Sequence, residues 1–418
     1  MRLTISSLIL AGLVSSALAS RQPPRGVVEP VEVPDAHGHG NLKEAVDCTV
    51  TASGGDDAPK FLAAVKGCAT TKIPKGTTLN IATRLDMTGL RDKHISVQGT
   101  IRFNPDIPYW TGNAFFIPFQ TQVTFWLLGG QNIRVDGGGT LDGAGQPWYD
   151  AFAKNSTLLR PIILTVFQAQ DVTIKDINMV NGPEWHNLVN EAQRVTYDNI
   201  NIKAASTSSN TAKNTDGWNI YRSDSVDILN SVIVNGDDCV AFKPNATNVR
   251  VENLDCTGSH GISVGSLGQY PGMYDIVQNV LAKNIKMNKS GNGARIKAWA
   301  GPNVGSGIVK NITFEGFTDS AVDLPVVIDQ CYMTSASACA QFPSNTFIQD
   351  IYFNNMSGTG TKATVAQLSC SPGQRCSNIN VNDFRLSFPS GSAKYTCQNV
   401  QLRGNAASLF GACASTAA

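Results

Sequence analysis

Four short polar motifs carry the residues of this chain with the clearest chemical potential. Asp216 precedes Asp237 by 21 residues, and Asp238 precedes His260 by 22. If one turn of a coiled sheet takes about twenty-odd residues, such residues lie on neighbouring coils. The spacing therefore predicts that three carboxylates, an imidazole and two cations gather on one face. The motifs are Asn214-Thr215-Asp216-Gly217, Gly236-Asp237-Asp238-Cys239, Gly258-Ser259-His260-Gly261 and Arg295-Ile296-Lys297.

Clustered carboxylates suit the hydrolysis of a glycosidic bond. This reaction needs one carboxylic acid to protonate the leaving oxygen and one carboxylate to activate water or attack the sugar. Crowding favours the division of roles, because a nearby like charge keeps one acid protonated where an isolated acid would ionise. Asp237 and Asp238 are adjacent, so strict strand alternation would separate them. We expect a bulge or bend at Gly236 to turn both toward one groove.

The basic residues of the motifs fit an acidic substrate. Arg295 and Lys297 stand at i and i+2, so they share one face of a strand, and arginine can hold a carboxylate by two parallel hydrogen bonds. His260 has two possible roles, to hold the acid in place or to share its proton. The alternative is that the two cations only neutralise buried acids. The coil spacing of all six residues, beside glycines, favours the functional interpretation.

A repeated strand pattern predicts how these motifs are positioned. Each repeat has a β-branched strand, a turn at Asn or Asp, and a second alternating strand, and the corners lie roughly 23 to 39 residues apart, the range for solenoids. No helical pattern separates the strands, so the fold class is all-β, and we expect a single-domain parallel β-helix. A β-propeller is the runner-up architecture. Its blades need about 40 residues each and hairpin turns, and the repeat pattern of this chain fits neither. The corners are Asp176, Asn199, Asn230, Asn253, Asn284, Asn311 and Asp350.

The N-terminal part of the chain contains three further predicted segments. Residues 1–19 have a basic start, a short apolar run and a small-residue cleavage site, which predicts a signal peptide and a secreted, extracellular protein. Residues 20–47 are rich in proline and form a flexible lead-in, so the catalytic domain spans residues 48–418. Within it, residues 56–69 have apolar residues at helical spacing. We expect this helix to cap the open end of the coil stack.

Charge and hydropathy limit the partners of the mature protein. Removal of residues 1–19 leaves 32 basic and 32 acidic residues, so no long-range field steers a polyanion to the protein. We therefore expect no nucleic-acid partner, and an acidic substrate must be held by a local cluster such as Arg295 and Lys297. No second apolar stretch approaches the length of about 20 residues that a spanning helix needs. We expect a monomer without a membrane partner.

Cysteines and sequons also fit an oxidising compartment. The ten cysteines suggest sequential pairs, although the sequence leaves the connectivity open, and the spacing of a cysteine-based metal site is absent. We therefore expect no metal and no cofactor. The suggested pairs are Cys48 with Cys68, Cys239 with Cys256, Cys331 with Cys339, Cys370 with Cys376, and Cys397 with Cys413. Acceptor sequons for glycosylation begin at Asn155, Asn245, Asn288, Asn311 and Asn355.

The four motifs, in this order, resemble the signatures of the polygalacturonase family of glycoside hydrolases, and the resemblance covers the chain from about residue 50 to its end. It implies a right-handed parallel β-helix and inverting hydrolysis of α-1,4-linked galacturonan. Asp237 would be the general acid, Asp216 and Asp238 would activate the water, and His260 would support the acid. Sugar or its carboxylate would be contacted by Asn214, Arg295, Lys297 and, through a looser match in Asp329-Gln330-Cys331-Tyr332, Tyr332.

Departures from the endo-acting pattern indicate the exo-acting branch. Endo-acting members usually carry Gln before the paired aspartates, whereas this chain has Asn235-Gly236. Exo action requires one end of the groove to be blocked, and the chain offers several aromatic candidates for walls or sugar platforms, although such residues also build cores. These candidates are Trp185-His186, Trp218, Tyr221-Arg222 and Trp299.

Alternative functions stay open on the same fold. An endo-polygalacturonase or a rhamnogalacturonan or xylogalacturonan hydrolase would keep the acid chemistry, although the intact Arg295-Ile296-Lys297 motif argues against the last two. A calcium-dependent pectate lyase would instead cleave the polymer by elimination. The Asn-Thr-Asp and paired-Asp motifs argue against this alternative. The non-enzymatic alternative is a β-helix that binds pectin without turnover.

Overall fold

The computed structural model describes residues 46–416, which belong to one compact unit. The helices are α1 (Ala58–Gly67), α2 (Ile107–Asn113), α3 (Gln146–Lys154) and α4 (Ala336–Gln341), with short 3₁₀ turns η1 (Phe119–Thr121) and η2 (Ala407–Phe410). A small sheet contains β6 (Phe115–Ile117), β7 (Gln122–Thr124) and β10 (Pro161–Ile162).

A 25-stranded sheet forms the rest of the unit. Its strands are β1 (Asp47–Thr49), β2 (Thr70–Ile73), β3 (Thr78–Ile81), β4 (Leu85–Val97), β5 (Thr100–Phe103), β8 (Trp126–Asp136), β9 (Thr140–Asp142), β11 (Leu164–Val180), β12 (Asn187–Asn190), β13 (Gln193–Lys203), β14 (Trp218–Tyr221), β15 (Asp224–Val234), β16 (Val240–Phe242), β17 (Ala246–Thr257), β18 (Ile262–Leu267), β19 (Tyr274–Asn288), β20 (Asn292–Trp299), β21 (Ser306–Val322), β22 (Leu324–Tyr332), β23 (Asn345–Gly360), β24 (Thr364–Ser369), β25 (Cys376–Asn382), β26 (Arg385–Ser387), β27 (Lys394–Gln398) and β28 (Val400–Arg403).

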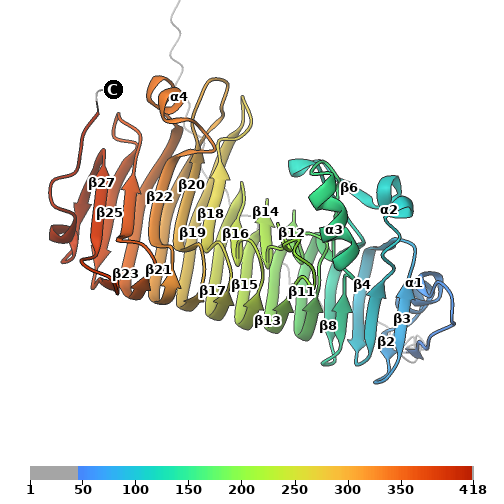
Figure 1. Cartoon of the computed structure of the whole chain (residues 1–418). Helices are drawn as coiled ribbons and strands as arrows, with labels where there is room; N and C mark the ends of the chain where they lie inside the picture. Colours follow the sequence, from blue (N-terminus) through green and yellow to red (C-terminus); the bar gives the residue numbers. More distant parts are fainter. Residues whose placement is uncertain (1–45, 417–418) are drawn as a thin grey trace, which may run out of the picture. The chain divides into compact units, whose positions relative to one another are not determined.

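From β12 to β23, each strand pairs in parallel with the strand two positions further along the chain. The long strands follow the series β13, β15, β17, β19, β21 and β23, and the short strands follow β12, β14, β16, β18, β20, β22 and β24. Each coil thus contributes one long and one short strand, and the coils stack in chain order (Figure 1). This confirms the predicted right-handed parallel β-helix and excludes the propeller.

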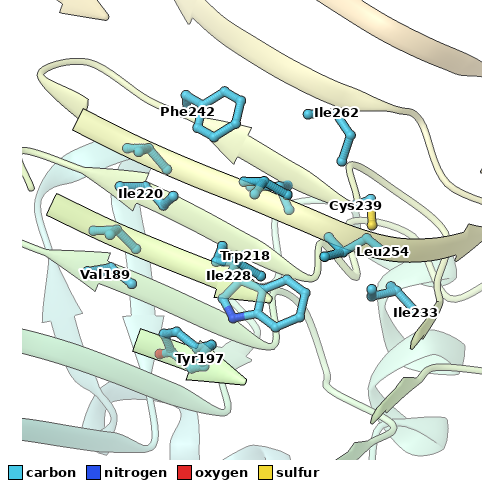
Figure 2. Packing of buried hydrophobic residues seen from close by; sticks show 14 of the residues in the cluster. Val189, Tyr197, Trp218, Ile220, Ile228, Ile233, Cys239, Phe242, Leu254 and Ile262 are labelled. Carbon is cyan, nitrogen blue, oxygen red and sulfur yellow. The ribbon is translucent and has the colours of Figure 1, made fainter. Parts of the chain in front are cut away.

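Apolar side chains on successive coils stack inside the helix and form its core. Val189 pairs with Ile220, and Ile220 pairs with Phe242, and Figure 2 shows the three side chains one above the other. All three are fully buried. Burial of a side chain of this size contributes about 1.5–3 kcal/mol, so each added coil extends the same favourable stack.

The Asn and Asp corners all adopt the left-handed backbone, but they form two ladders rather than one. Asn253 lies beside Asn230 in the preceding coil and donates a hydrogen bond of 2.9 Å to it. Every predicted corner has a positive φ, from 49° to 59°. The first ladder contains Asp176, Asn199, Asn230, Asn253 and Asn284, and the second contains Asn248, Asn279, Asn311, Asp350 and Asn378.

The single series of corners predicted from the sequence was therefore wrong at Asn311 and Asp350. Long strands of this part of the stack bend twice, five residues apart, as β19 does at Asn279 and Asn284. Both bends favour the same residue types, because Asn and Asp tolerate left-handed backbone. In β21, the first-ladder position beside Asn284 is occupied by Gly316 rather than by Asn or Asp.

Helix α1 has the position of the predicted cap, although it is shorter than residues 56–69. Its buried residues include Phe61, whose ring meets Trp126 edge-on at 5.9 Å. The carboxylate of Asp57, just before the helix, accepts hydrogen bonds from the backbone N–H groups of Ser53 and Asn80 and so fixes the start of the helix to neighbouring segments. The helix ends at Gly67, since Cys68 is extended and bonded to Cys48. The helix packs on β2, β3 and β4, at the end of the stack (Figure 1).

The remaining structural predictions concern disulfides, sequons and the N-terminal segment. All ten cysteines form the five sequential pairs. Among the sequons, the side chains at 155, 311 and 355 are exposed, whereas Asn245 and Asn288 are half-buried, and their glycosylation stays a prediction. The predicted signal peptide and most of the lead-in lie outside the described residues, although β1 already begins at Asp47. No described helix has the length and apolar character needed to cross a membrane.

Candidate active site

The three predicted aspartates come together at the floor of a cavity of about 520 Å³. Asp216 lies just before β14, and Asp237 and Asp238 lie just before β16, on the next coil. One oxygen of each carboxylate lies within 4.8 Å of the others. Asp216 and Asp238 are buried, whereas the side chain of Asp237 is 20% exposed. Asp237 is therefore the most accessible of the three carboxyl groups.

A tight turn makes it possible for adjacent aspartates to face the same cavity. Residues 235–239 lie between β15 and β16, so strand alternation does not apply to them, and the expected distortion is a turn rather than a bulge. The side chain of Asn235 donates to the backbone oxygens of Thr215, Asp237 and Asp238, at 3.0 Å each. A Cβ atom at Gly236 would come within 2.4 Å of the carbonyl oxygen of Ala212. Glycine is thus needed here for close approach.

Asp238 is surrounded by cations. The ammonium of Lys297 lies 2.7 Å from one of its oxygens, and the guanidinium of Arg295 lies 3.9 Å from the other. Ser263 donates a hydrogen bond of 2.7 Å to the same carboxylate. Burial raises the pKa of Asp238, but Lys297, Arg295 and Lys243 together outweigh it and hold the pKa well below its ordinary value. Asp238 is therefore ionised at any pH of interest.

Asp216 has the opposite electrostatic surroundings. Burial, followed by the negative charges of Asp237 and Asp238, raises its pKa well above the ordinary value. The side chain of Asn219 donates a hydrogen bond of 3.2 Å to it. The triad therefore keeps a proton at a pH where an isolated aspartic acid has lost it.

Asp237 is held from two sides. His260 Nδ1 lies 3.2 Å from one carboxylate oxygen, and the side-chain amide of Asn214 donates to the other at 3.2 Å. Asn214 is oriented in turn by the buried Arg160, which donates to its Oδ1 at 2.8 Å. The hydrogen bond to Asp237 raises the pKa of His260, against a smaller effect of burial, so the imidazolium form is favoured.

Tyr332 lies at the end of β22 beside the two cations. Its ring centroid is 5.4 Å from the Arg295 guanidinium carbon and 5.5 Å from the Lys297 ammonium. Trp299 packs edge-on against the same ring at 5.9 Å. The structure therefore brings together every residue that the motifs singled out, including the loosely matched tyrosine.

The aromatic candidates for walls divide into three kinds. Trp218 and His186 are completely buried and belong to the interior, so the prediction that they form walls was wrong. Trp185 lines the cavity. Tyr221 stacks on Phe119 at 3.8 Å and supports the wall that η1 forms.

Several cavity residues escaped the sequence reasoning. Glu184 is the most informative, because burial raises its pKa to about 7 although Arg160 opposes the effect. It stands three residues before β12, as Asp237 stands three before β16, so extending the coil register backward would have found it. The others have no role assigned by the four motifs. Gln120, Thr121 and Gln122 come from a distant segment, whereas Lys243 follows Asp238 by five residues, and Ser266, Gln269 and Tyr270 lie in or just after β18.

A parallel β-helix with clustered carboxylates in a polar cavity defines a class of proteins that act on polysaccharides. Residues 65–411 match the family described as Glycosyl hydrolases family 28, and the chain belongs to this family. It is 46% identical to an exopolygalacturonase of Cochliobolus carbonum, over 85% of this chain and 84% of that protein. It is 43% identical to exopolygalacturonase X-1 of Emericella nidulans, over 83% and 84%.

A solved structure is also similar. Endo-xylogalacturonan hydrolase from Aspergillus tubingensis has 32% identity and a TM-score of 0.80, covering 89% of this chain and 100% of that one. The similar proteins therefore include both exo-acting and endo-acting enzymes. The residues that close the cavity bear on which mode of action applies to this chain.

Proposed function

We propose that this protein is a secreted exopolygalacturonase, which removes galacturonate from the end of α-1,4-linked galacturonan by acid and base hydrolysis. The family, the names of the relatives and the carboxylate triad support a glycoside hydrolase. Cations beside the triad support an acidic substrate. Five disulfides support an oxidising, extracellular setting.

The observation that favours exo action is a bridge at the wall of the cavity. The side-chain amide of Gln120, in η1, donates a hydrogen bond of 3.0 Å to Gln269, which follows β18. Both residues line the cavity together with Tyr270. Phe119 anchors η1 by stacking on Tyr221. A bridge of this kind blocks the path of a continuous polymer, so that a chain end enters rather than a chain middle.

In the proposed reaction, Asp237 donates a proton to the glycosidic oxygen as the bond from this oxygen to C-1 breaks. Asp238 accepts a proton from water as the water oxygen attacks C-1, and Asp216 helps to orient this water. His260 and Asn214 hold the carboxyl group of Asp237 in position from two sides. The exposure of Asp237 and the ionised state of Asp238, whose oxygens can accept a proton, support this division of labour.

The high pKa of Asp216 supports a competing assignment, in which Asp216 rather than Asp237 holds the catalytic proton. The two assignments predict that a substrate with a good leaving group restores activity to different variants. An aryl galacturonide with a good leaving group needs little protonation, so it should restore activity only to the variant that lacks the acid. We expect rescue of Asp237→Asn and not of Asp216→Asn, and the reverse result would exchange their roles.

Product sizing tests the proposed function. The protein is incubated with polygalacturonic acid, and early products are separated by size. Galacturonate alone supports exo action, whereas mixed oligomers support an endo-polygalacturonase. If no reducing ends form, the hydrolase proposal fails, and binding of the intact polymer would then support a pectin-binding module. Unsaturated products that disappear with a chelator would support a calcium-dependent lyase.

The stereochemistry of the product tests inversion. The carboxylate oxygens lie within 4.8 Å of one another, closer than the roughly 6.5–9.5 Å usual between inverting carboxyl groups, so inversion rests on the family resemblance alone. Proton nuclear magnetic resonance of the first product should give the β-anomer, and an initial α-anomer would mean retention.

A xylogalacturonan hydrolase is the second candidate, because one similar structure has that activity. Equal amounts of xylogalacturonan and polygalacturonic acid in one assay distinguish the two, and we expect faster release from the unsubstituted polymer. Size-exclusion chromatography of the secreted protein tests the accompanying proposal that it is a monomer.

A further inference from the structure

Lys243 is a buried cation that faces the cavity. It is 6% exposed and lines the cavity, yet its ammonium has no hydrogen-bond or ion-pair partner among residues 46–416. Lys297, in contrast, is paired with Asp238 at 2.7 Å. A buried charge without a partner is unfavourable, because no attraction to a counter-ion offsets the loss of its hydration. The energetics of Lys243 therefore favour an anion in the cavity.

The coil register places Lys243 two coils away from Lys297. Phe242 pairs with Val264, and Val264 pairs with Ile296. The residues that follow these three, Lys243, Gly265 and Lys297, thus come at the same level of successive coils. Gly265 contributes no side chain between the two lysines, because a Cβ atom there would come within 2.5 Å of the carbonyl oxygen of Lys297, and both lysines line the cavity.

Trp185 defines the side of the cavity on which Lys243 lies. The ammonium is 5.3 Å from the centroid of the indole ring, and Trp185 lines the same cavity. The cavity therefore has two cationic positions. Lys297 and Arg295 form ion pairs with Asp238, whereas Lys243 beside Trp185 is available to contact an anionic group of the substrate.

We infer that Lys243 binds the C-6 carboxylate of the terminal galacturonate, and that it makes the pocket selective for a free uronic acid over a neutral sugar. The inference rests on the proposed function, because it assumes that a galacturonan end enters this cavity. The rival role for Lys243 is to balance the charge of the triad, which it also approaches. That role would affect the reaction and leave selectivity at C-6 unchanged.

Two disaccharides separate these roles. One is digalacturonate, and the other carries galactose in place of galacturonate at the non-reducing position, so the pair differs only by carboxylate against hydroxymethyl at C-6. Hydrolysis of both is measured with the wild-type protein and with Lys243→Met, which keeps the length of the side chain and removes its charge. Lys243→Arg tests whether positive charge alone is sufficient.

We expect Lys243→Met to lower kcat/KM for digalacturonate by roughly 10- to 100-fold, mainly through KM, as for loss of a hydrogen bond to a charged group. The neutral disaccharide should change by less than about threefold. Lys243→Arg should retain most of the preference for the charged substrate. Equal losses on both disaccharides, or an unchanged preference in Lys243→Met, would overturn the inference.

Two controls make the result interpretable. Lys310→Met removes an exposed lysine of β21 outside the cavity and should leave both substrates unaffected. Thermal melting of each variant shows whether it is folded. If the wild type cleaves neither disaccharide nor polygalacturonic acid, the proposed function fails. If it cleaves them without any preference at C-6, only the inference fails.

Discussion

Polar side chains stack coil upon coil at two places in this β-helix, with opposite consequences. In the first corner ladder, neutral amides satisfy one another, as Asn253 does by donating to Asn230 and accepting from Asn284. In the cavity, the same stacking brings Asp216 against Asp237 and Asp238, so like charges meet where water is scarce.

The difference lies in charge and burial rather than in the backbone. Exposed amides carry both donors and acceptors, so a ladder of them adds favourable hydrogen bonds in every coil. Carboxylates only accept, so stacking them raises the pKa of one and requires cations beside another. The parallel stack thus gives rigidity at the corners and reactivity in the cavity.

The largest expected effect is that of Asp237→Asn on activity. Removal of the proton donor should lower kcat by about 10²- to 10⁴-fold, the usual contribution of general acid catalysis. The variant should melt at the same temperature as the wild type or higher, because one of three crowded carboxyl groups is gone. Release of reducing ends and a thermal melt check both expectations, and wild-type activity would remove Asp237 from the mechanism.

Asp319 tests whether buried charge is costly away from the cavity. Both of its oxygens are buried without a hydrogen-bond partner among residues 46–416, and burial raises its pKa well above the ordinary value. The unfolded chain therefore loses this proton first, so the free energy of unfolding should fall as the pH rises from about 4 toward the folded pKa. Asp319→Asn should abolish this fall and be about 1–3 kcal/mol more stable than the wild type at neutral pH.

Asp323→Asn is the matched control for this prediction. Asp323 is exposed and paired with Lys362, and hydrogen bonds from Lys362 and Thr361 lower its pKa, so its contribution is lost at low rather than high pH. Denaturation of both variants from pH 4 to 8 gives the comparison. A pH-independent difference between Asp319→Asn and the wild type would contradict the account.

Asn253→Ala should weaken the corner without affecting the chemistry. It removes hydrogen bonds of 2.9 and 3.2 Å and places alanine at a φ of 59°, for a loss of about 2 kcal/mol in the free energy of unfolding. Activity should not change, since Asn253 does not line the cavity. Asn253→Gly should lose less, because Gly316 occupies the same ladder position naturally. Denaturant titration measures both, and equal losses would mean that backbone strain plays no part.

Gln120→Ala gives the smallest predicted effect. Loss of the bridge to Gln269 should leave the hydrolysis of digalacturonate nearly unchanged, while a minor fraction of longer oligomers appears from polygalacturonic acid. Gln131→Ala, at an exposed hydrogen bond to Arg91, serves as the control. Products that stay purely monomeric in Gln120→Ala would show that this hydrogen bond does not block the groove.

Local sequence was sufficient for much of the fold and most of the candidate site. Strand patterns with Asn or Asp corners identify coils, and the spacing of Asp216, Asp237 and His260 matches one coil each, because parallel stacking repeats at a nearly constant chain length. It failed where two positions favour the same residue types, so Asn311 and Asp350 were assigned to the wrong ladder. It also failed for aromatic residues, since Trp218 in the core and Trp185 at the cavity have similar sequence contexts.

What the sequence by itself determined is therefore the β-helix, its capping helix and the charged floor of the cavity. Only the tertiary structure decided how the cavity is closed, because Gln120 and Gln269 are 149 residues apart and meet across it. It also decided which cation is free, since the ion pair between Lys297 and Asp238 joins residues 59 apart and leaves Lys243 without a partner in the described part of the chain. Such contacts depend on three-dimensional distance, which motif spacing along the chain does not specify.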